Sequence, residues 1–507
     1  MVLIKKNIFR NEKDISVNPN KDDLIFQTTD WNCSDYWEKP DEDTDEYQKS
    51  TRLFEIRAYG ITNHKYSIFI KIIGQKPYLY IKVPNFWNRN YLFRFKEQLK
   101  NKVYDSLSES VYKCRLIKRK ELYGFHNENK FKFVEIVCDN IGCFYSVRNV
   151  LEGKWPNREK TIEEYGKCKI RLFKIGDETF DFSEDIYESN ISPLLRYFHD
   201  CDGDPAGWFK IPAKKYEILV EKDTRCQLEV RCNAKHMKKY EGMSGISPLV
   251  TASFDIECTS FDGSFPKPER KFDEIIQIGT TVHKYGEKTC CFKSMITLKK
   301  CDPIDGVEVI CCENERKLLI EWAKLIKRID PDIITGYNIW GFDMIYIYKR
   351  CINGCGGTYS DFNMLFSEIY SRNKKHKVKF IEKKLASSAL GENFLKYYDS
   401  EGIIGIDMFK LIQKDFNLGS YKLDSVSQKF ISGNVIEFDI NEEDNSIDIT
   451  SNNTDGLTVG QHVSLNLSTK YVNKENIKKK YKISKIDGKR FTICDISVED
   501  LFQHNIN

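Results

Sequence analysis

Hydrophobic and polar positions in the middle of the chain predict a sheet flanked by helices. Residues 249–258 and 273–283 are apolar and β-prone, which predicts two buried strands that pair with each other. Residues 330–338 predict a short strand that leads into a turn, and residues 341–348 predict the start of a helix. Residues 313–329 show the spacing of an amphipathic helix, with apolar side chains at Leu318, Leu319, Trp322, Leu325, Ile326 and Ile329. We therefore expect an α/β domain here.

The patterns on either side of this region differ from it. Upstream, short strands such as residues 66–73 alternate with helices, which predicts a β-rich amino-terminal domain. Downstream, alternating apolar residues around Asp487 and Gly488 predict a β-hairpin. We expect a polar, partly disordered amino terminus at residues 1–48 and the β-rich domain at residues 49–245. The α/β domain is expected at residues 246–430, followed by a small inserted β module at residues 431–495 and a truncated return to the α/β domain at residues 496–507.

Asp255 and Glu257 are the most informative residues of the first central strand. Side chains two positions apart on a strand point to the same face, so both carboxylates project from one side of the sheet. Such a pair persists when it shares a proton or when cations neutralise it, and hard oxygen ligands suit Mg²⁺ or Mn²⁺. Asn338 and Asp343 fall at a strand-to-helix junction, where active-site groups of open α/β sheets collect. An Asp-x-Glu tripeptide taken alone is more simply an exposed strand face.

Longer motifs carry a family resemblance. Phe254–Glu257 resembles the first exonuclease motif of family B DNA polymerases, and Tyr337–Asp343 resembles the second, with its Tyr-Asn-x-x-x-Phe-Asp spacing. Gly402–Ser427 resembles the segment that leads to the Tyr-x-Leu-x-x-Val helix of polymerase delta and of large-virus polymerases. Other segments occur in the order expected of that family's amino-terminal region, namely Tyr59–Thr62, Pro77–Tyr80, and Tyr187–Asn190 with Trp208.

The resemblance implies a 3′→5′ proofreading exonuclease on a ribonuclease H-like sheet. Asp255, Glu257 and Asp343 would be the catalytic residues and would bind two Mg²⁺ or Mn²⁺ ions, which clamp the attacking and leaving oxygens of the phosphodiester. The implied partner is DNA, as a single-stranded 3′ end or a primer-template. The implied contacts to that DNA are Tyr337, Asn338, Phe342 and Tyr421. The expected location is intracellular, in the nucleus or at a viral replication site in the host cytoplasm.

The chain also departs from the family pattern. We find no Tyr-x-x-x-Asp motif between Ser427 and Asn507, and no motifs of the palm, so palm, fingers and thumb are expected to be absent. Asp43–Asp45 is interpreted as a solvated acidic loop. With one metal lacking a carboxylate, we expect weak exonuclease activity or none. Two alternatives stay open: a split polymerase completed by a carboxy-terminal polymerase chain, with a processivity factor as a further candidate partner, and a stand-alone nuclease or non-catalytic DNA-binding remnant.

Composition adds less to the argument. The net charge of +4 is too small to prove a nucleic-acid partner. Two basic runs, residues 113–120 and 372–379, could follow a DNA backbone, the second with base stacking on Phe380, Tyr397 and Tyr398, but solvated loops are an equal interpretation. The 17 cysteines are scattered, which indicates reduced thiols in an intracellular protein. No apolar run is long enough to predict a membrane span.

Overall fold

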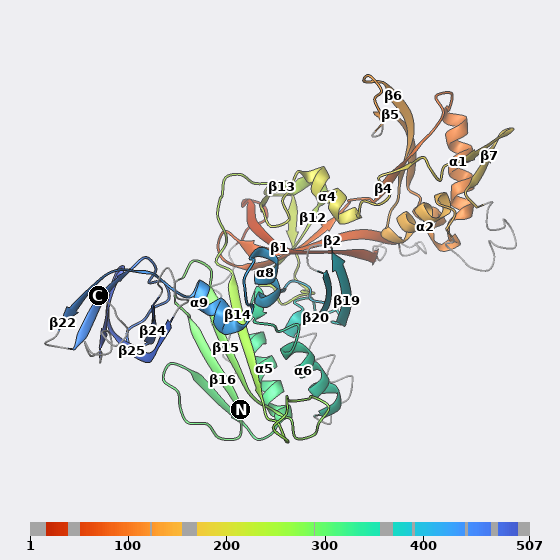
Figure 1. Cartoon of the computed structure of the whole chain (residues 1–507). Coiled ribbons are helices and arrows are strands. Elements are labelled where there is room, and N and C mark those ends of the chain that lie inside the picture. The colour runs from red at the N-terminus through yellow and green to blue at the C-terminus, as the bar shows by residue number, and fades with distance from the viewer. Residues whose placement is uncertain are drawn as a thin grey trace.

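The computed structural model describes residues 17–38, 51–121, 124–154, 170–287, 289–354, 369–387, 391–441, 445–467 and 475–494. Within these residues the strands form six sheets, the largest with seven strands. Figure 1 shows them as separate groups along the chain, with the amino-terminal sheets in red to yellow, a central sheet in green and a smaller sheet in blue.

The first group is built on a seven-stranded sheet. Its strands are β1 (Leu24–Glu38), β2 (Thr51–Thr62), β3 (Ser67–Ile73), β10 (Trp208–Ile211), β11 (Tyr216–Ile218), β12 (Leu228–Asn233) and β13 (Lys238–Lys239), with the short turn η2 (Ala234–His236). They pair in the order β11-β12-β3-β2-β1-β10-β13, and α4 (Pro193–Cys201) packs on β1, where the rings of Trp31 and Phe198 lie 4.9 Å apart. The expected partial disorder of residues 1–48 therefore does not extend to β1, because Leu24 and Phe26 are buried in this sheet.

A four-stranded sheet with two helices forms the outer part of this group. The strands are β4 (Tyr78–Lys82), β5 (Lys113–Lys120), β6 (Lys130–Val137) and β9 (Ile186–Tyr187), and the helices are α1 (Arg89–Lys102) and α2 (Ile141–Leu151). The order β5-β6-β4-β9 and the chain order β-α-β-β-α-β are those of a ferredoxin-like motif. The turn η1 (Asp105–Ser110) and the hairpin of β7 (Leu172–Ile175) and β8 (Glu178–Asp181) complete it.

A six-stranded mixed sheet forms the centre of the chain. Its strands are β14 (Val250–Cys258), β15 (Ile275–Lys284), β16 (Phe292–Leu298), β17 (Glu308–Cys312), β18 (Ile333–Gly336) and β21 (Ile404–Asp407), in the order β17-β16-β15-β14-β18-β21. The predicted pairing of the first two strands is confirmed, and the structure shows that it is antiparallel, while β14, β18 and β21 run parallel. The helices α5 (Glu315–Ile329) and α6 (Asp343–Lys349), followed by the short π-helix η3 (Arg350–Gly354), complete the expected α/β architecture.

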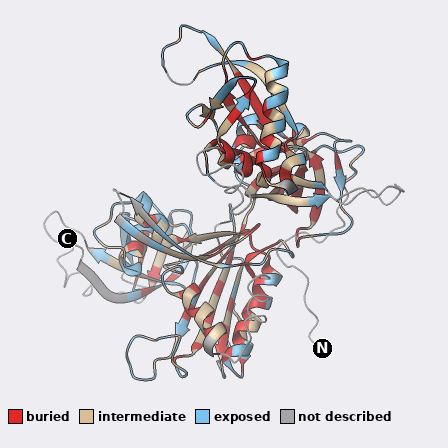
Figure 2. Ribbon diagram, turned by 90° about the vertical axis from the view of Figure 1, so that its right-hand side faces the viewer, coloured by how far each residue is buried: buried red, intermediate tan, exposed pale blue. Residues whose placement is uncertain are grey.

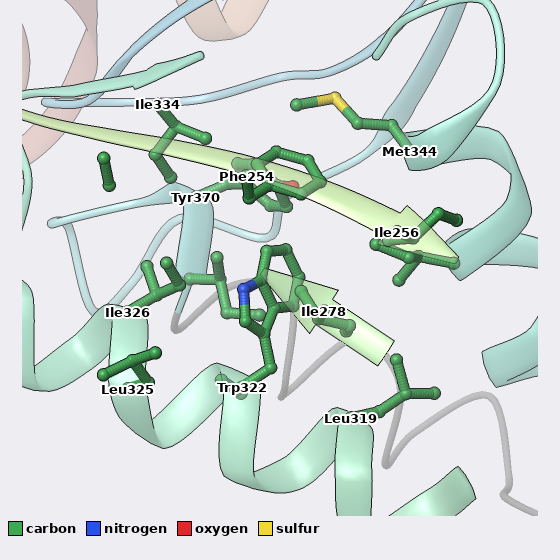
Figure 3. Packing of buried hydrophobic residues seen from close by; sticks show 14 of the residues in the cluster. Phe254, Ile256, Ile278, Leu319, Trp322, Leu325, Ile326, Ile334, Met344 and Tyr370 are labelled. Atoms are coloured by element: carbon green, nitrogen blue, oxygen red, sulfur yellow. The ribbon is translucent and has the colours of Figure 1, made fainter. Parts of the chain in front are cut away.

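The core of the central sheet follows from the alternation of β14. Phe254 and Ile256 are buried on the face that meets α5, and the ring of Phe254 lies 4.9 Å from that of Trp322 (Figure 3). Full burial of side chains of this size contributes roughly 1.5–3 kcal/mol each. The prediction for α5 is confirmed, because all six of its predicted apolar residues are buried. The opposite face of β14 is left for polar side chains.

The segment between α6 and β21 corrects one prediction. The hairpin of β19 (Phe380–Ser387) and β20 (Gly391–Tyr398) carries the aromatics that we assigned to base stacking. Tyr398 is 5% exposed and stacks on Tyr370 with ring centroids 4.6 Å apart, and Phe380 stacks on Tyr348 at 4.5 Å. The base-stacking hypothesis is wrong for Tyr398 and Phe380, because other rings of the core cover their faces. Two short helices follow β21, namely α8 (Met408–Asp415) and α9 (Leu423–Phe430).

A small five-stranded sheet follows α9. Its strands are β22 (Val435–Asn441), β23 (Ser446–Ser451), β24 (His462–Leu467), β25 (Glu475–Asp487) and β26 (Arg490–Cys494), in the order β22-β23-β26-β25-β24. The hairpin predicted at Asp487 and Gly488 is confirmed, since Asp487 pairs with Arg490. The sheet has its own core of Ile447, Ile449, Tyr481, Ile483, Phe491 and Ile493. The expected return at residues 496–507 and the acidic residues 43–45 lie outside the described residues.

Buried charges join the seven-stranded sheet to the central sheet. Arg57 on β2 donates to Glu401, just before β21, at 2.7 Å, and Glu401 is 1% exposed. Arg372 is fully buried and contacts Asp330 and Asp332 at 3.0 Å each. The DNA-backbone interpretation of residues 372–379 is therefore wrong for Arg372, because its charge is buried against two carboxylates between α5 and β18. Figure 2 shows buried residues concentrated within the sheets on both sides of the contact between the two large sheets.

The cysteines and the apolar segments were the remaining subjects of the composition-based expectations. None of the fifteen cysteines among the described residues forms a disulfide. No described helix combines the length and the apolar character that crossing a membrane requires.

Candidate active site

The two carboxylates of β14 lie on its polar face, as predicted. Asp255 and Glu257 are exposed, whereas Phe254 and Ile256 between and beside them are buried. Across the antiparallel pairing, Asp255 stands directly opposite Gly279 of β15. Gly279 itself adds no side chain beside the Asp255 carboxylate, and a Cβ at that position would meet the side chain of Met295 at 3.6 Å. The strand thus presents two carboxylates on one exposed face.

Asp343, the first residue of α6, is brought to the same place. Its carboxylate is only 3% exposed and accepts a hydrogen bond from the backbone N–H of Ile256 at 3.1 Å. The paired part of β18 reaches only as far as Ser253 on β14, so Asp343 replaces the missing strand as the partner of that N–H. Burial, and after it the nearby charge of Asp255, raises the pKa of Asp343 to about 7.

The donor set suits a divalent cation, but only in part as predicted. Asp255 and Asp343 are neighbouring carboxyl groups. Burial raises the pKa of Asp255 as well, and this effect is larger than the lowering of the pKa by the hydrogen bond with Asp343. A cation would relieve this repulsion, and carboxylate oxygens are the ligands that Mg²⁺ and Mn²⁺ prefer. Among the residues that the structure describes, however, no group of three or more His, Cys, Asp or Glu side chains is arranged to hold a metal ion. Glu257 is therefore not gathered with the other two into such a group.

A tight turn between β18 and α6 fixes the position of Asp343. Gly336 lies so close to β14 that a Cβ there would stand 2.6 Å from the carbonyl oxygen of Phe254. Asn338 adopts a left-handed conformation with φ 60°, and its carbonyl accepts the N–H groups of Gly341 and Phe342 at 2.9 and 3.0 Å. This closed turn starts α6 at Asp343 and points its first carboxylate at β14.

Asp407, at the end of β21, holds this turn and was missed by the sequence analysis. One of its oxygens accepts the N–H of Asn338 at 2.9 Å and the other accepts the N–H of Trp340 at 3.0 Å. It also caps α8 through the N–H of Phe409 at 2.9 Å. Because backbone groups occupy both oxygens and the residue is 1% exposed, Asp407 positions the site and is not offered as a metal ligand. Its one sequence signal was an aspartate at a strand-to-helix junction.

The residues predicted to contact DNA line the same turn. The hydroxyl of Tyr337 donates to the carbonyl oxygen of Tyr421 at 2.5 Å, and the ring of Tyr337 packs on that of Phe409 at 5.7 Å. The hydroxyl of Tyr421 donates in turn to the carbonyl oxygen of Phe416 at 2.9 Å. Tyr337, Asn338 and Tyr421 are therefore brought together by the turn and the segment before α9.

The loop between β14 and β15, residues 259–274, is a second feature that the sequence analysis missed. It presents three aromatic side chains to solvent, with exposed fractions of 74% for Phe261, 72% for Phe265 and 56% for Phe272. Phe265 packs edge-on against Phe342, with centroids 5.3 Å apart, which places it beside the turn that carries Asp343. Exposed rings that pack on a site residue suit the stacking of a ligand's bases.

Buried polar groups hold that loop in shape. Asp273 is fully buried and accepts the N–H groups of Phe261 at 3.0 Å and Lys267 at 2.8 Å. Arg350 is 1% exposed and donates to the loop carbonyl of Arg270 at 2.8 Å while it pairs with Glu315. The exposed rings are therefore presented by a built loop whose shape does not depend on a ligand.

Comparison with known proteins supports this assignment of motifs. The family model for the DNA polymerase family B exonuclease domain matches residues 184–426. The model for the DNA polymerase delta catalytic subunit-like N-terminal domain matches residues 74–143. Both matches lie on segments that the structure uses for the two amino-terminal sheets and the central sheet.

Individual relatives agree with the family models. A DNA polymerase of Pyramimonas orientalis virus is 28% identical over 592 residues, covering 90% of this chain and 45% of the relative. The DNA polymerase delta catalytic subunit of Schizosaccharomyces pombe is 31% identical over 420 residues, covering 82% and 35%. The solved structure of the family B DNA polymerase from the archaeon Pyrobaculum calidifontis is 16% identical, and the match covers 80% of this chain and 39% of that polymerase. Its TM-score of 0.47 is too low to bear on the site. The chain spans less than half the length of these relatives, and it belongs to the family B DNA polymerases, matching their amino-terminal part and exonuclease domain.

Proposed function

We propose that the chain carries the 3′→5′ proofreading exonuclease of a replicative DNA polymerase and acts on the 3′ end of single-stranded DNA. The observation that carries this proposal is the meeting of the Asp255 and Asp343 carboxyl groups at β14. Two neighbouring carboxyl groups whose pKa values are both raised by their surroundings have the character of a functional site.

Asp255 and Asp343 would hold Mg²⁺ or Mn²⁺, with Glu257 turning toward the ions as the third carboxylate. When bound, the ions would supply activation of a water nucleophile and stabilisation of the charge on the leaving 3′ oxygen. The chain's own part is positional: Asp407 fixes the turn, the turn fixes Asp343, and the N–H of Ile256 keeps the Asp343 carboxylate against β14.

The substrate strand would enter over the exposed rings of the 259–274 loop. Phe265 and Phe342 form an edge-on pair next to the carboxylates, on which a terminal base can stack. Asn338 and Tyr337 lie in the turn that leads to Asp343, where they can steady the sugar and phosphate of the last nucleotide. Tyr421 would support Tyr337 from the segment before α9.

The test is the release of nucleotides from a 5′-labelled single-stranded oligonucleotide by the whole chain, with Mg²⁺ or Mn²⁺ and with EDTA. We expect slow, metal-dependent shortening from the 3′ end, because the fourth carboxylate of the family pattern was not found. Asp255→Ala and Asp343→Ala should each reduce it to background. Thr251→Ala, on the same strand and distant from the carboxylates, is a matched control that should leave the rate unchanged. Shortening that survives in both aspartate variants would refute the proposal.

A second candidate is a DNA-binding part without catalysis of its own. The absence, among the described residues, of a group of three carboxylates arranged for a metal ion favours it. It predicts single-strand binding with no shortening of the oligonucleotide, even with Mn²⁺ and excess protein. A carboxy-terminal polymerase chain that completes the site, and a processivity factor, remain candidate partners. Replication in the nucleus or at a viral replication site in the cytoplasm remains the predicted setting.

A further inference from the structure

We propose that the β5–β6 hairpin is a second contact surface for single-stranded nucleic acid, separate from the carboxylate site. This basic hairpin comprises residues 113–121 and 124–132, at the outer edge of the four-stranded sheet, where β5 has a neighbour on one side only (Figure 1). It goes beyond the proposed exonuclease, because none of its residues belongs to the site around Asp255.

The hairpin concentrates positive charge. Residues 113–132 contain seven basic and two acidic side chains, a net charge of +5, whereas the whole chain has a net charge of +4. The surplus of positive charge in this protein is therefore local to one hairpin. The seven basic residues are Lys113, Arg115, Lys118, Arg119, Lys120, Lys130 and Lys132.

The register of the two strands places like charges opposite each other. Lys118 stands across from Lys132, and Lys120 stands across from Lys130. Like charges directly opposite on neighbouring strands destabilise a sheet. Lysines on an edge strand can protect it from pairing with other sheets, but that purpose needs charges on β5 alone. The additional lysines on the inner strand β6 extend the positive charge beyond the edge strand itself.

Several of these charges have no acidic partner in the part of the chain that the structure describes. Lys113, Lys118, Arg119 and Lys130 are exposed and form no ion pair within the described residues. The others have partners: Arg115 pairs with Glu135, Lys120 pairs with Glu128, and Lys132 donates to the carbonyl oxygens of Asn85 and Trp87, just before α1. The four unpaired cations of the first group are the part of the hairpin available to phosphates.

Aromatic rings next to these cations favour a strand with accessible bases over a duplex. Phe125, in the turn of the hairpin, is 90% exposed. The ring of His126 packs on Phe131 at 4.9 Å, and the ammonium group of Lys82 lies 4.5 Å from the same Phe131 ring. Rings interleaved with cations bind single strands by base stacking and backbone attraction together, and duplexes keep their bases inside. Because the chain belongs to a DNA polymerase family, a nucleic acid is the anionic ligand that we assign to this hairpin.

The experiment is fluorescence anisotropy of a labelled oligothymidylate with the whole chain in EDTA, at several salt concentrations, so that no strand is degraded. The triple variant Lys118→Gln, Arg119→Gln and Lys130→Gln should weaken binding at least tenfold at low salt. Losing three phosphate contacts should also lower the slope of log K against log salt by about 2. Phe125→Ala should weaken binding at every salt concentration and leave the slope unchanged.

The matched control removes the same charge from elsewhere. Lys215, Lys235 and Lys238 are exposed and cluster around His236, whose pKa is lowered by burial and by these three charges. Changing all three to Gln should leave binding within about twofold of the unchanged chain, since non-specific attraction alone depends on total charge. Equal losses in the two triple variants, or no loss in the hairpin variant, would overturn the proposal. Far-ultraviolet circular dichroism and the melting temperature confirm that each variant is folded.

Two points separate the hairpin proposal from the exonuclease proposal and from membrane binding. Binding is measured in EDTA and needs no metal ion at the carboxylate site, so a failure of the exonuclease proposal leaves this one standing. Phosphatidylserine vesicles should not be retained by the hairpin. Hairpin-dependent binding of vesicles without binding of the oligonucleotide would assign the surface to a membrane and refute the nucleic-acid ligand.

Discussion

The backbone N–H of Ile256 on β14 donates a hydrogen bond to the Asp343 carboxylate on α6, 3.1 Å away. This bond fixes one candidate metal ligand to the strand that carries the other. It also gives the buried carboxylate a structural duty that is independent of its charge. The two duties of Asp343 can therefore be separated by substitution.

Asp343→Asn should fold like the unchanged chain, because the amide oxygen still accepts the Ile256 N–H. Asp343→Ala leaves that buried N–H without a partner, and the free energy of unfolding should fall by roughly 1–3 kcal/mol. Urea unfolding at neutral pH measures this difference. Isothermal titration with Mn²⁺ should show lost affinity in both variants. An Asn variant as unstable as the Ala variant would contradict the structural duty assigned to the bond.

Gly336 offers a test of the close approach between β18 and β14. In Gly336→Ala the new methyl group meets the carbonyl oxygen of Phe254 at 2.6 Å and the side chain of Ile339 at 2.4 Å. Overpacking of this kind costs about 1–3 kcal/mol and should displace the turn, so both stability and strand shortening should fall. Gly405→Ala is the control: it lies on the neighbouring strand, and its Cβ would meet only the Trp340 ring at 4.0 Å. Equal effects of the two substitutions would argue against the contact.

Local patterns were enough to predict the elements that carry the site. The alternation of β14 placed Asp255 and Glu257 on one face, and the helical spacing of α5 identified the side chains that cover the other face. Both signals operate within a few residues, so they survive without knowledge of the fold. The pairing of β14 with β15 followed because two apolar strands were adjacent in the chain.

Features that depend on distant partners could not be predicted. Asp407 acts on Asn338, 69 positions away, and nothing near Asp407 in the chain announces that contact. Arg372 looked like part of a basic surface run, yet the carboxylates that bury it lie 40 and 42 positions upstream. Charge alone does not tell a solvated patch from a buried ion pair, because the answer depends on what the fold brings opposite.

Asp407 should prove to be a positioning residue for the turn. Asp407→Ala removes the acceptors of three backbone N–H groups, so we expect a loss of stability of about 1–3 kcal/mol and weaker binding of a single-stranded oligonucleotide. Asn314→Ala removes the side-chain cap of α5, far from the turn, and should cost about 1 kcal/mol without changing oligonucleotide binding. Urea unfolding and anisotropy measure the two effects. If both variants bind the oligonucleotide equally well, Asp407 stabilises the fold only.

The joint between the two large sheets should weaken in acid. Burial raises the pKa of Glu401, but the charge of Arg57 and hydrogen bonds from Arg57, Asn373 and Tyr59 outweigh it and hold that pKa below its usual value. A carboxyl group with a lowered folded-state pKa contributes stability above its unfolded pKa and loses it as the pH falls through the folded value. Glu401→Gln should therefore be less stable than the unchanged chain by about 2 kcal/mol at pH 7, since it leaves the Arg57 charge without its counterion. This difference in the free energy of unfolding should become smaller as urea unfolding is repeated from pH 5 downward. The control is Glu217→Gln, at an exposed pair with Arg231, which should differ little from the unchanged chain at any pH. A gap for Glu401→Gln that stays constant down to pH 3.5 would mean that the ionised carboxylate is not what stabilises the joint.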